Sequence, residues 1–113
     1  MLKANFITAQ EAAEKIQDGS TLCTIGMTLV SASESILKAI EKRFETVGHP
    51  ADITLVHSCG QSDRKDGIQH LAHEGLVKRI VGSHWGLQPR WMEMIANSQV
   101  EAYCLPQGQI AQL

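Results

Sequence analysis

The sequence lacks several features that would define other classes of protein. It has no run of about 18 consecutive apolar residues, so no membrane span is predicted. Its first residues include one basic side chain, Lys3, without the apolar core of a secretory signal. Lysine and arginine number 10 against 12 aspartate and glutamate, so it also lacks the basic excess that nucleic-acid phosphates favour. We therefore expect no membrane or nucleic-acid partner.

The sequence also lacks the closely spaced residues that are typical of a metal site or of a set of disulfide bonds. The three cysteines are widely spaced and form no CxxC motif, which is typical of free thiols in a reducing cytoplasm. His70 and His73 are three residues apart and could share one helical face. A metal site would need further ligands such as Glu74, His57 or Asp63, and none of these stands at a diagnostic spacing. We expect no metal and a cytoplasmic protein.

The length and composition fit one globular domain. The chain has 113 residues, of which 43% are hydrophobic and 19% charged. Helical and strand patterns alternate, which predicts an open, mostly parallel α/β sheet flanked by helices. We expect a buried strand over residues 21–25, further strands over 53–57, 79–81 and 100–105, and a surface loop over 61–67. Helices are expected after capping boxes at 8–11 and 31–34, and from Pro89.

Glycines follow or end the four predicted strands, at Gly26, Gly60, Gly82 and Gly108. Parallel sheets bind ligands at the carboxyl ends of their strands, and glycine allows a ligand to approach the backbone. Each glycine alone is equally compatible with a tight turn. The presence of a glycine at the end of all four strands predicts a ligand-binding edge of the sheet, but it does not indicate which ligand binds there.

Gln107 is the candidate binding side chain at that edge. It lies between Pro106 and Gly108 at the end of the fourth predicted strand, where its amide could donate to a carbonyl or carboxylate oxygen. An exposed loop glutamine is the simpler interpretation of the same residue. Glu34 and Glu74 are the carboxylates expected nearest the edge, and the capping box already accounts for Glu34. No GxSxG or GxGxxG motif is present.

Several stretches in order resemble the family I coenzyme A transferases, in the propionate and acetate CoA-transferase branch. They are ITAQEAA at 7–13, IEKRFETVGHP at 40–50, HEGLVKR at 73–79, GSHWG at 82–86 and EAYCLPQG at 101–108. The resemblance covers almost the whole chain. It implies an open α/β sheet and transfer of CoA between an acyl-CoA and a carboxylate, through a glutamyl-CoA intermediate. Coenzyme A is then a substrate, and no cofactor is expected.

The resemblance assigns few residues. The glutamine of the family's PQG motif contacts the substrate carbonyl or carboxylate, and it matches Gln107. In the first loop, Ile25-Gly26-Met27 stands where the family has Gly-Gly-Phe, so Gly26 alone keeps the close approach. We expect Gly26, Gly60 and Gly108 to contact substrate or CoA.

The resemblance also implies that this chain corresponds to only one part of the enzyme. The chain is similar to the N-terminal part of the family's α-type domain, residues 1–113, and the nucleophilic glutamate belongs to the β-type half. We expect the remainder of the enzyme or a β-type subunit as a partner, and a homo-oligomer that covers an open sheet edge. The alternative is a non-catalytic relic or a small-ligand or partner-binding module of the same fold.

Overall fold

The computed structural model describes residues 2–113 and contains one sheet of four parallel strands in the order β1-β2-β3-β4. The strands are β1 (Thr21–Thr24), β2 (Ile53–His57), β3 (Val77–Gly82) and β4 (Glu101–Cys104). The helices are α1 (Ala9–Glu14), α2 (Glu34–Val47), the 3₁₀ helix η1 (Gly67–Leu71), α3 (Pro89–Ala96) and α4 (Gln107–Ile110). The predicted parallel α/β sheet is confirmed.

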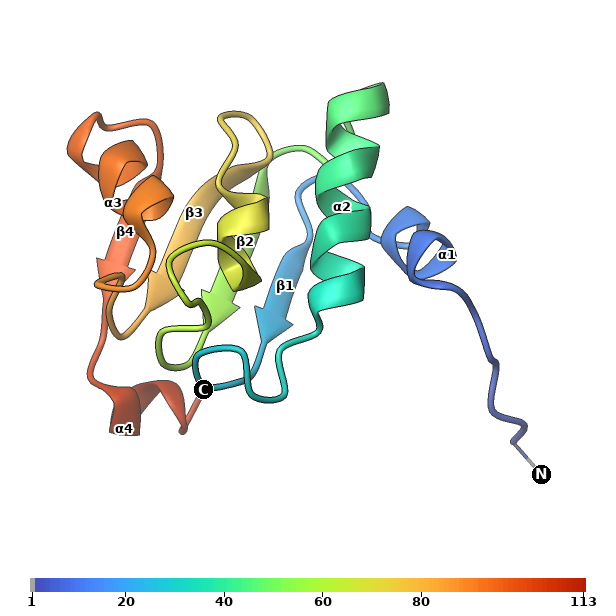
Figure 1. The fold of residues 1–113 in the computed structure, drawn as a ribbon, viewed down its shortest axis with the longest axis horizontal. Helices are drawn as coiled ribbons and strands as arrows, with labels where there is room; N and C mark the ends of the chain where they lie inside the picture. The colour runs from blue at the N-terminus through green and yellow to red at the C-terminus, as the bar shows by residue number, and fades with distance from the viewer. Residues whose placement is uncertain (1) are drawn as a thin grey trace.

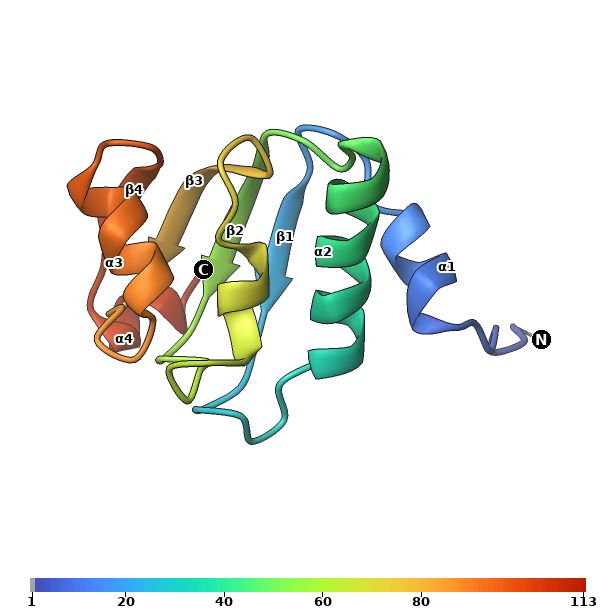
Figure 2. The same ribbon diagram turned by 45° about the horizontal axis from the view of Figure 1, so that its top comes forward.

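The connecting helices lie on one face of the sheet. In Figures 1 and 2, η1 and α3 stand in front of the strands, α2 stands next to β1, and α1 lies beside α2 beyond the β1 edge. Successive right-handed crossovers that add each strand beside the last place their helices on the same side. Arg43 of α2 donates to the carbonyls of Ala13 and Ile16 at 2.9 Å each, which ties the end of α1 to α2. None of the helices in the described chain has the length and apolar character that a membrane crossing requires.

The hydrophobic core lies between the sheet and this helical layer. Ile53, Leu55 and His57 alternate along β2 and are fully buried, as a period-two pattern requires. Apolar side chains from the helices meet them, and these include Leu37, Ile40, Ile68, Leu71 and Trp91. The indole nitrogen of Trp91 donates to the carbonyl of Ile68 at 2.9 Å, so α3 and η1 are joined inside the core.

The opposite face of the sheet is half exposed. The strand register aligns Cys23, Val56, Val81 and Tyr103 in one row across the sheet. Cys23 and Tyr103 are exposed, whereas the two valines are half-buried. The prediction that the first strand is buried is therefore wrong, because β1 is an edge strand with helices on one face only.

The two predicted capping boxes have different outcomes. At α1, the amide of Glu11 donates to Thr8 Oγ1 at 3.1 Å and the amide of Thr8 donates to Glu11 Oε2 at 2.9 Å, so this box is confirmed. At α2, the N-cap is Ser33, which makes no side-chain capping bond. Ser31 has a φ of 62° and does not cap the helix, so the second box is wrong.

The loop of residues 61–67 is only partly on the surface. Asp63, Arg64 and Lys65 are exposed, but Gln61 and Ser62 are fully buried. Gln61 Nε2 donates to the carbonyls of Thr24 and Ser58 at 2.8 and 3.1 Å. The predicted surface loop is corrected at its start, because Gln61 joins the ends of β1 and β2.

Replacing Ile40 with alanine tests the core. Ile40 is fully buried in α2, so Ile40→Ala should lower the free energy of unfolding by about 2–5 kcal/mol through lost burial and a cavity. Ile36→Ala is the matched control, because Ile36 is 37% exposed on the same helix and should cost less than about 1 kcal/mol. Urea unfolding measures both, and equal losses would contradict this placement of α2.

Candidate active site

The carboxyl ends of the strands meet at one edge of the sheet, at the bottom of Figure 1. The loops that follow the strands are tied together there. The amide of Thr28, after β1, donates to the carbonyl of Gly60, after β2, at 2.9 Å. The amide of Leu105, after β4, donates to the carbonyl of Gly82 at 2.9 Å. These bonds join the loops in two pairs, the first after β1 and β2 and the second after β3 and β4.

Gln107 is held at this edge in one orientation. It is the exposed first residue of α4, and its Oε1 accepts a hydrogen bond from the amide of Cys59 at 3.0 Å. Its Nε2 meets no acceptor within residues 2–113. Because a side-chain amide has both donors and an acceptor, fixing the oxygen leaves the two N–H groups for another molecule.

Cys59, which holds Gln107, lies in a strained turn with a φ of 52°. The carbonyl of Cys59 is 2.8 Å from His57 Nδ1 and accepts its proton. His57 Nε2 is 3.0 Å from Trp85 Nε1, which is always a donor, so this nitrogen of the histidine is the acceptor. Burial lowers the pKa of His57 and favours the neutral ring that both bonds require.

The strand-end glycines leave room for these side chains. A Cβ on Gly82 would collide with the ring of His57, and a Cβ on Gly60 would lie 2.6 Å from Cε1 of His84. Gly26 has a φ of 146°, and its Cβ would lie 3.0 Å from the carbonyl oxygen of Val30. At Gly108 nothing lies within 4 Å. Packing therefore explains three of the glycines, and only Gly108 is open in that direction.

Three polar side-chain atoms near the same edge are buried without a hydrogen-bond partner in the described part of the chain. They are Thr24 Oγ1 at the end of β1, Gln61 Oε1 after β2 and Ser83 Oγ after β3. Such atoms are uncommon in folded proteins and call for a specific partner. The carboxyl edge of the sheet therefore has polar atoms in its buried part as well as on its surface.

Neither predicted carboxylate is free at this edge. Glu74 precedes β3, at the amino end of the strands, and its Oε2 accepts from Gln99 at 3.2 Å. Glu34 begins α2, but it accepts from the amide of Gly67 and is 2.6 Å from His70. The expectation for Glu74 is therefore wrong, because the chain reverses direction between η1 and β3.

The anchoring roles of His57 and Cys59 were missed from the sequence. His57 continues the inward pattern of Ile53 and Leu55, and this alternation is the signal that places its ring in the core. Nothing in the local sequence indicates that Cys59 meets Gln107, because the two are 48 residues apart.

Residues 6–113 match the family model described as coenzyme A transferase. The chain belongs to the coenzyme A transferase family. It is 36% identical over 111 residues to a caffeate CoA-transferase of Acetobacterium woodii, an alignment that covers 97% of this chain and 21% of that protein. It is 34% identical over 108 residues to the acetate CoA-transferase YdiF of Escherichia coli K12, covering 94% of this chain and 20% of that one.

Solved structures agree with this membership. The acyl-CoA transferase YdiF of E. coli O157:H7, as a thioester complex with CoA, superimposes with a TM-score of 0.84 at 33% identity. The match covers 90% of this chain and 21% of that chain. The chain thus spans about a fifth of the length of the CoA-transferases that it matches.

Substituting Gly82 tests the packing under the edge. In Gly82→Ala the new methyl group displaces the ring of His57 and weakens its bonds to Cys59 and Trp85, so the free energy of unfolding should fall by about 1–3 kcal/mol. Gly108→Ala is the control, because that position is open and helical, and its effect should stay within about 1 kcal/mol. Urea unfolding of both variants is the measurement. Equal stability of the two would refute the packing of His57 against Gly82.

The buried histidine predicts a pH dependence. Since the fold lowers the pKa of His57 below its ordinary value of 6.5, its contribution to stability is present above pH 6.5 and is lost as pH falls below it. The difference in unfolding free energy between the wild type and His57→Asn should therefore shrink from pH 7.5 to pH 5.5. Urea unfolding at both values measures it, and a difference independent of pH would show that the ring is not held neutral.

Proposed function

We propose that this chain is the N-terminal part, residues 1–113, of a CoA-transferase α-type domain, and that it presents Gln107 to the substrate. The whole enzyme would move CoA between a short-chain acyl-CoA and a carboxylic acid. The family and the relatives support the reaction class. The observation that carries the role of this chain is the bond from Cys59 to Gln107 Oε1, which leaves the amide nitrogen to act as a donor.

The chemistry needs such a donor. In this reaction a glutamate carboxylate attacks the acyl-CoA thioester and expels the CoA thiolate, which leaves an acyl-glutamyl anhydride. The thiolate then attacks the glutamyl carbonyl and releases the carboxylic acid as its anion, which gives glutamyl-CoA. Covalent catalysis of this kind divides one transfer into easier steps. Negative charge develops on the carbonyl oxygen during each attack, and a fixed N–H donor such as Gln107 Nε2 stabilises it.

The neighbouring backbone would complete the contact surface. Gly26, Gly60 and Gly108 remain the proposed substrate or CoA contacts. Gly108 is the strongest of them, because it adjoins Gln107 and has open space around it. The unpaired buried atoms of Thr24, Gln61 and Ser83 support a polar site at this edge.

The nucleophile would come from outside this chain. Glu34, one of the two carboxylates that the sequence placed near the edge, is held by His70 and Gly67 and is not available for attack. The remainder of the enzyme or a β-type subunit would supply the catalytic glutamate. The half-exposed row of Cys23, Val56, Val81 and Tyr103 supports a partner on that face, because parallel sheets are usually covered on both faces.

Two further features belong to the proposal. The enzyme would form a homo-oligomer, since both β1 and β4 are edge strands within residues 2–113. It would work in the cytoplasm, which the three free cysteines support. A non-catalytic relic or a small-ligand or partner-binding module of the same fold is the alternative.

A chimera tests the proposal. This chain would replace the matching segment of E. coli YdiF, and the rate of CoA transfer from acetyl-CoA to propionate would be measured. We expect transfer by the folded chimera. Gln107→Ala should lower the rate about 10- to 100-fold, because the donor to the oxyanion is lost. Gln107→Glu keeps an oxygen for Cys59 but turns a carboxylate outward, so it should lose at least as much.

Gln109→Ala is the matched control, because Gln109 is an exposed glutamine on the same short helix. This variant should transfer CoA at the rate of the parent chimera. A folded chimera without transfer would favour the non-catalytic module, and unchanged kinetics in Gln107→Ala would remove Gln107 from the site.

A further inference from the structure

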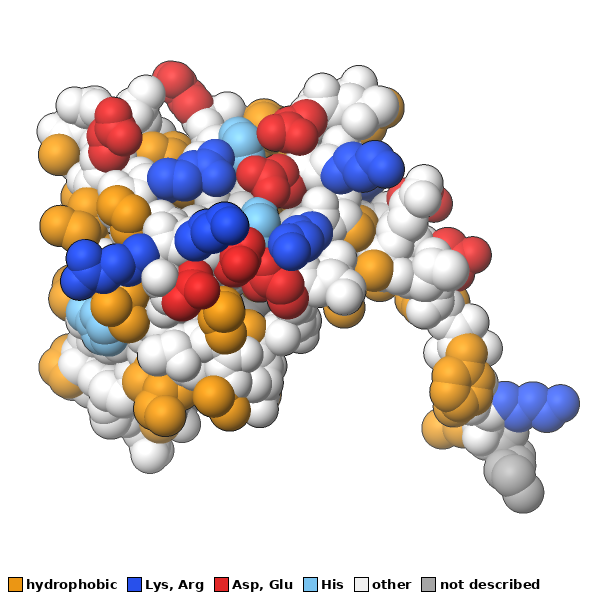
Figure 3. Space-filling model, in the orientation of Figure 1, with side chains coloured by type: hydrophobic (Ala, Val, Ile, Leu, Met, Phe, Trp, Pro, Cys, Tyr) orange, Lys and Arg blue, Asp and Glu red, His pale blue; other side chains and the backbone are white. Residues whose placement is uncertain are grey.

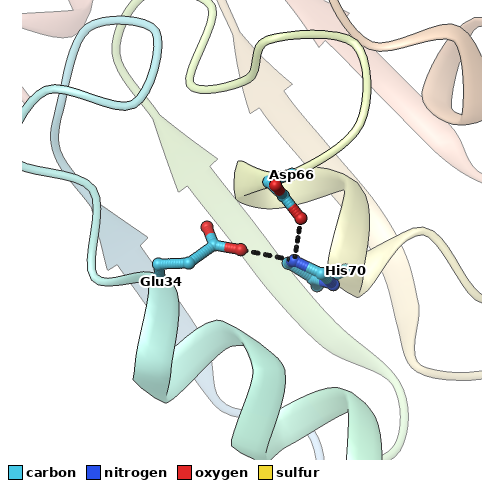
Figure 4. A group of neighbouring side chains, drawn as sticks. All are labelled: Glu34, Asp66 and His70. Carbon is cyan, nitrogen blue, oxygen red and sulfur yellow. Dashed lines mark hydrogen bonds and ion pairs between the residues drawn. The ribbon is translucent and has the colours of Figure 1, made fainter.

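A second group of functional side chains lies on the helical face, apart from the edge that carries Gln107. Glu34 of α2, together with Asp66 and His70 of the η1 segment, converges on one point, as Figure 4 shows. Glu34 Oε1 is 2.6 Å and Asp66 Oδ1 is 3.4 Å from the same ring atom, His70 Nε2. Figure 3 shows acidic side chains gathered around histidine on this face, within reach of solvent. Sequence spacing could not reveal the group, because Glu34 is 36 residues from His70.

The group has more acceptors than a proton can satisfy. His70 Nε2 carries at most one hydrogen, and Glu34 accepts it at the shorter distance. The side chain of Asp66 accepts no hydrogen bond from any residue in the range 2–113, and the nearest basic nitrogen to it there is His70 Nε2, at 3.4 Å. A cation with several coordination positions satisfies both carboxylates and the ring nitrogen together, which a single proton does not.

The other ring nitrogen is held as in metal-binding histidines. His70 Nδ1 is 2.6 Å from Glu41 Oε2, which fixes the plane of the ring and directs Nε2 at Glu34 and Asp66. Histidines that bind metals usually donate their second N–H to a carboxylate or carbonyl in this way. The second carboxylate oxygen of Glu34, Oε2, is also held, because it accepts a hydrogen bond from the amide of Gly67 at 2.9 Å.

We propose that Glu34, Asp66 and His70 form a binding site for a divalent first-row transition cation such as Zn²⁺. One imidazole and two carboxylates are suitable ligands, and a fourth position faces solvent. Two ligand atoms on tetrahedral Zn²⁺ lie about 3.4 Å apart for bonds of about 2.1 Å. The separation of Asp66 and His70, 3.4 Å, already matches this spacing. Glu34 must withdraw by less than about 1 Å to reach the same separation.

A metal would have to compete with groups that already contact these ligand atoms. Lys38 Nζ is 3.6 Å from Glu34 Oε1 and is 56% exposed, so it can turn away into solvent. A metal would also replace the contact between His70 Nε2 and Glu34 Oε1, which are 2.6 Å apart. Glu41 stays as the partner of Nδ1, since its other oxygen is held by His73 at 2.7 Å.

A neighbouring group of Glu41, Glu45 and His73 is the weaker candidate. Arg90 already stands against it, with Nη1 3.6 Å from Glu41 Oε1 and Nη2 3.2 Å from His73 Nε2. The guanidinium places a permanent positive charge at the point where a metal would bind, which opposes a second cation.

Titration of the 113-residue chain with Zn²⁺ by calorimetry tests the proposal. We expect one Zn²⁺ per chain at pH 7.5. Asp66→Asn and His70→Asn should remove this binding. Glu41→Gln should weaken it about 10- to 100-fold, because it loosens the orientation of the ring. The Asp66 side chain makes no hydrogen bond within the described residues, so Asp66→Asn should keep the circular dichroism and unfolding midpoint of the wild type.

Two control variants keep the result specific. His49→Asn removes an exposed histidine that pairs with Asp18 elsewhere, and Glu45→Gln changes only the neighbouring group. Both should bind Zn²⁺ like the wild type. The proposal is overturned if the chain takes up no Zn²⁺, if folded Asp66→Asn binds as tightly as the wild type, or if Glu45→Gln is the variant that loses binding. None of these results bears on CoA transfer, so the two proposals stand or fall separately.

Discussion

The buried ring of His57 holds the carboxyl edge of the sheet together. It donates from one nitrogen to the carbonyl of Cys59 and accepts from Trp85 at the other. It therefore joins the end of β2 to the turn after it and to the loop after β3. Cys59, fixed in this way, holds Gln107 of α4 through its amide. A ring that is neutral and has one donor and one acceptor is what this chain of contacts requires.

Features with a strong local period could be predicted from the sequence. The alternation of Ile53 and Leu55 marked β2, and Thr8 with Glu11 marked the start of α1. The shared carboxyl edge followed from the topology alone, because parallel strands end on the same side. The position of Gln107 at that edge was also predictable, since it directly follows the fourth strand.

Features that depend on distant residues could not be predicted. Glu34 fits a capping pattern with Ser31, yet its carboxylate turns to Gly67 and His70, because contacts across the fold outweigh a weak local preference. Gln61 lies in a polar stretch but is buried where the ends of β1 and β2 meet. The prediction that β1 is buried was wrong for a similar reason. The apolar pattern of the strand does not reveal which face of the sheet the helices leave uncovered.

The central claim is that Gln107 directs its oxygen inward to Cys59 and its nitrogen outward to the substrate. Hydrogen exchange of the Cys59 amide, followed by NMR in the wild type, Gln107→Ala and Gln107→Glu, tests it most directly. We predict slow exchange in the wild type and in Gln107→Glu, which both offer an oxygen to the amide, and faster exchange in Gln107→Ala. The same exchange rate in all three proteins would contradict this orientation of the glutamine.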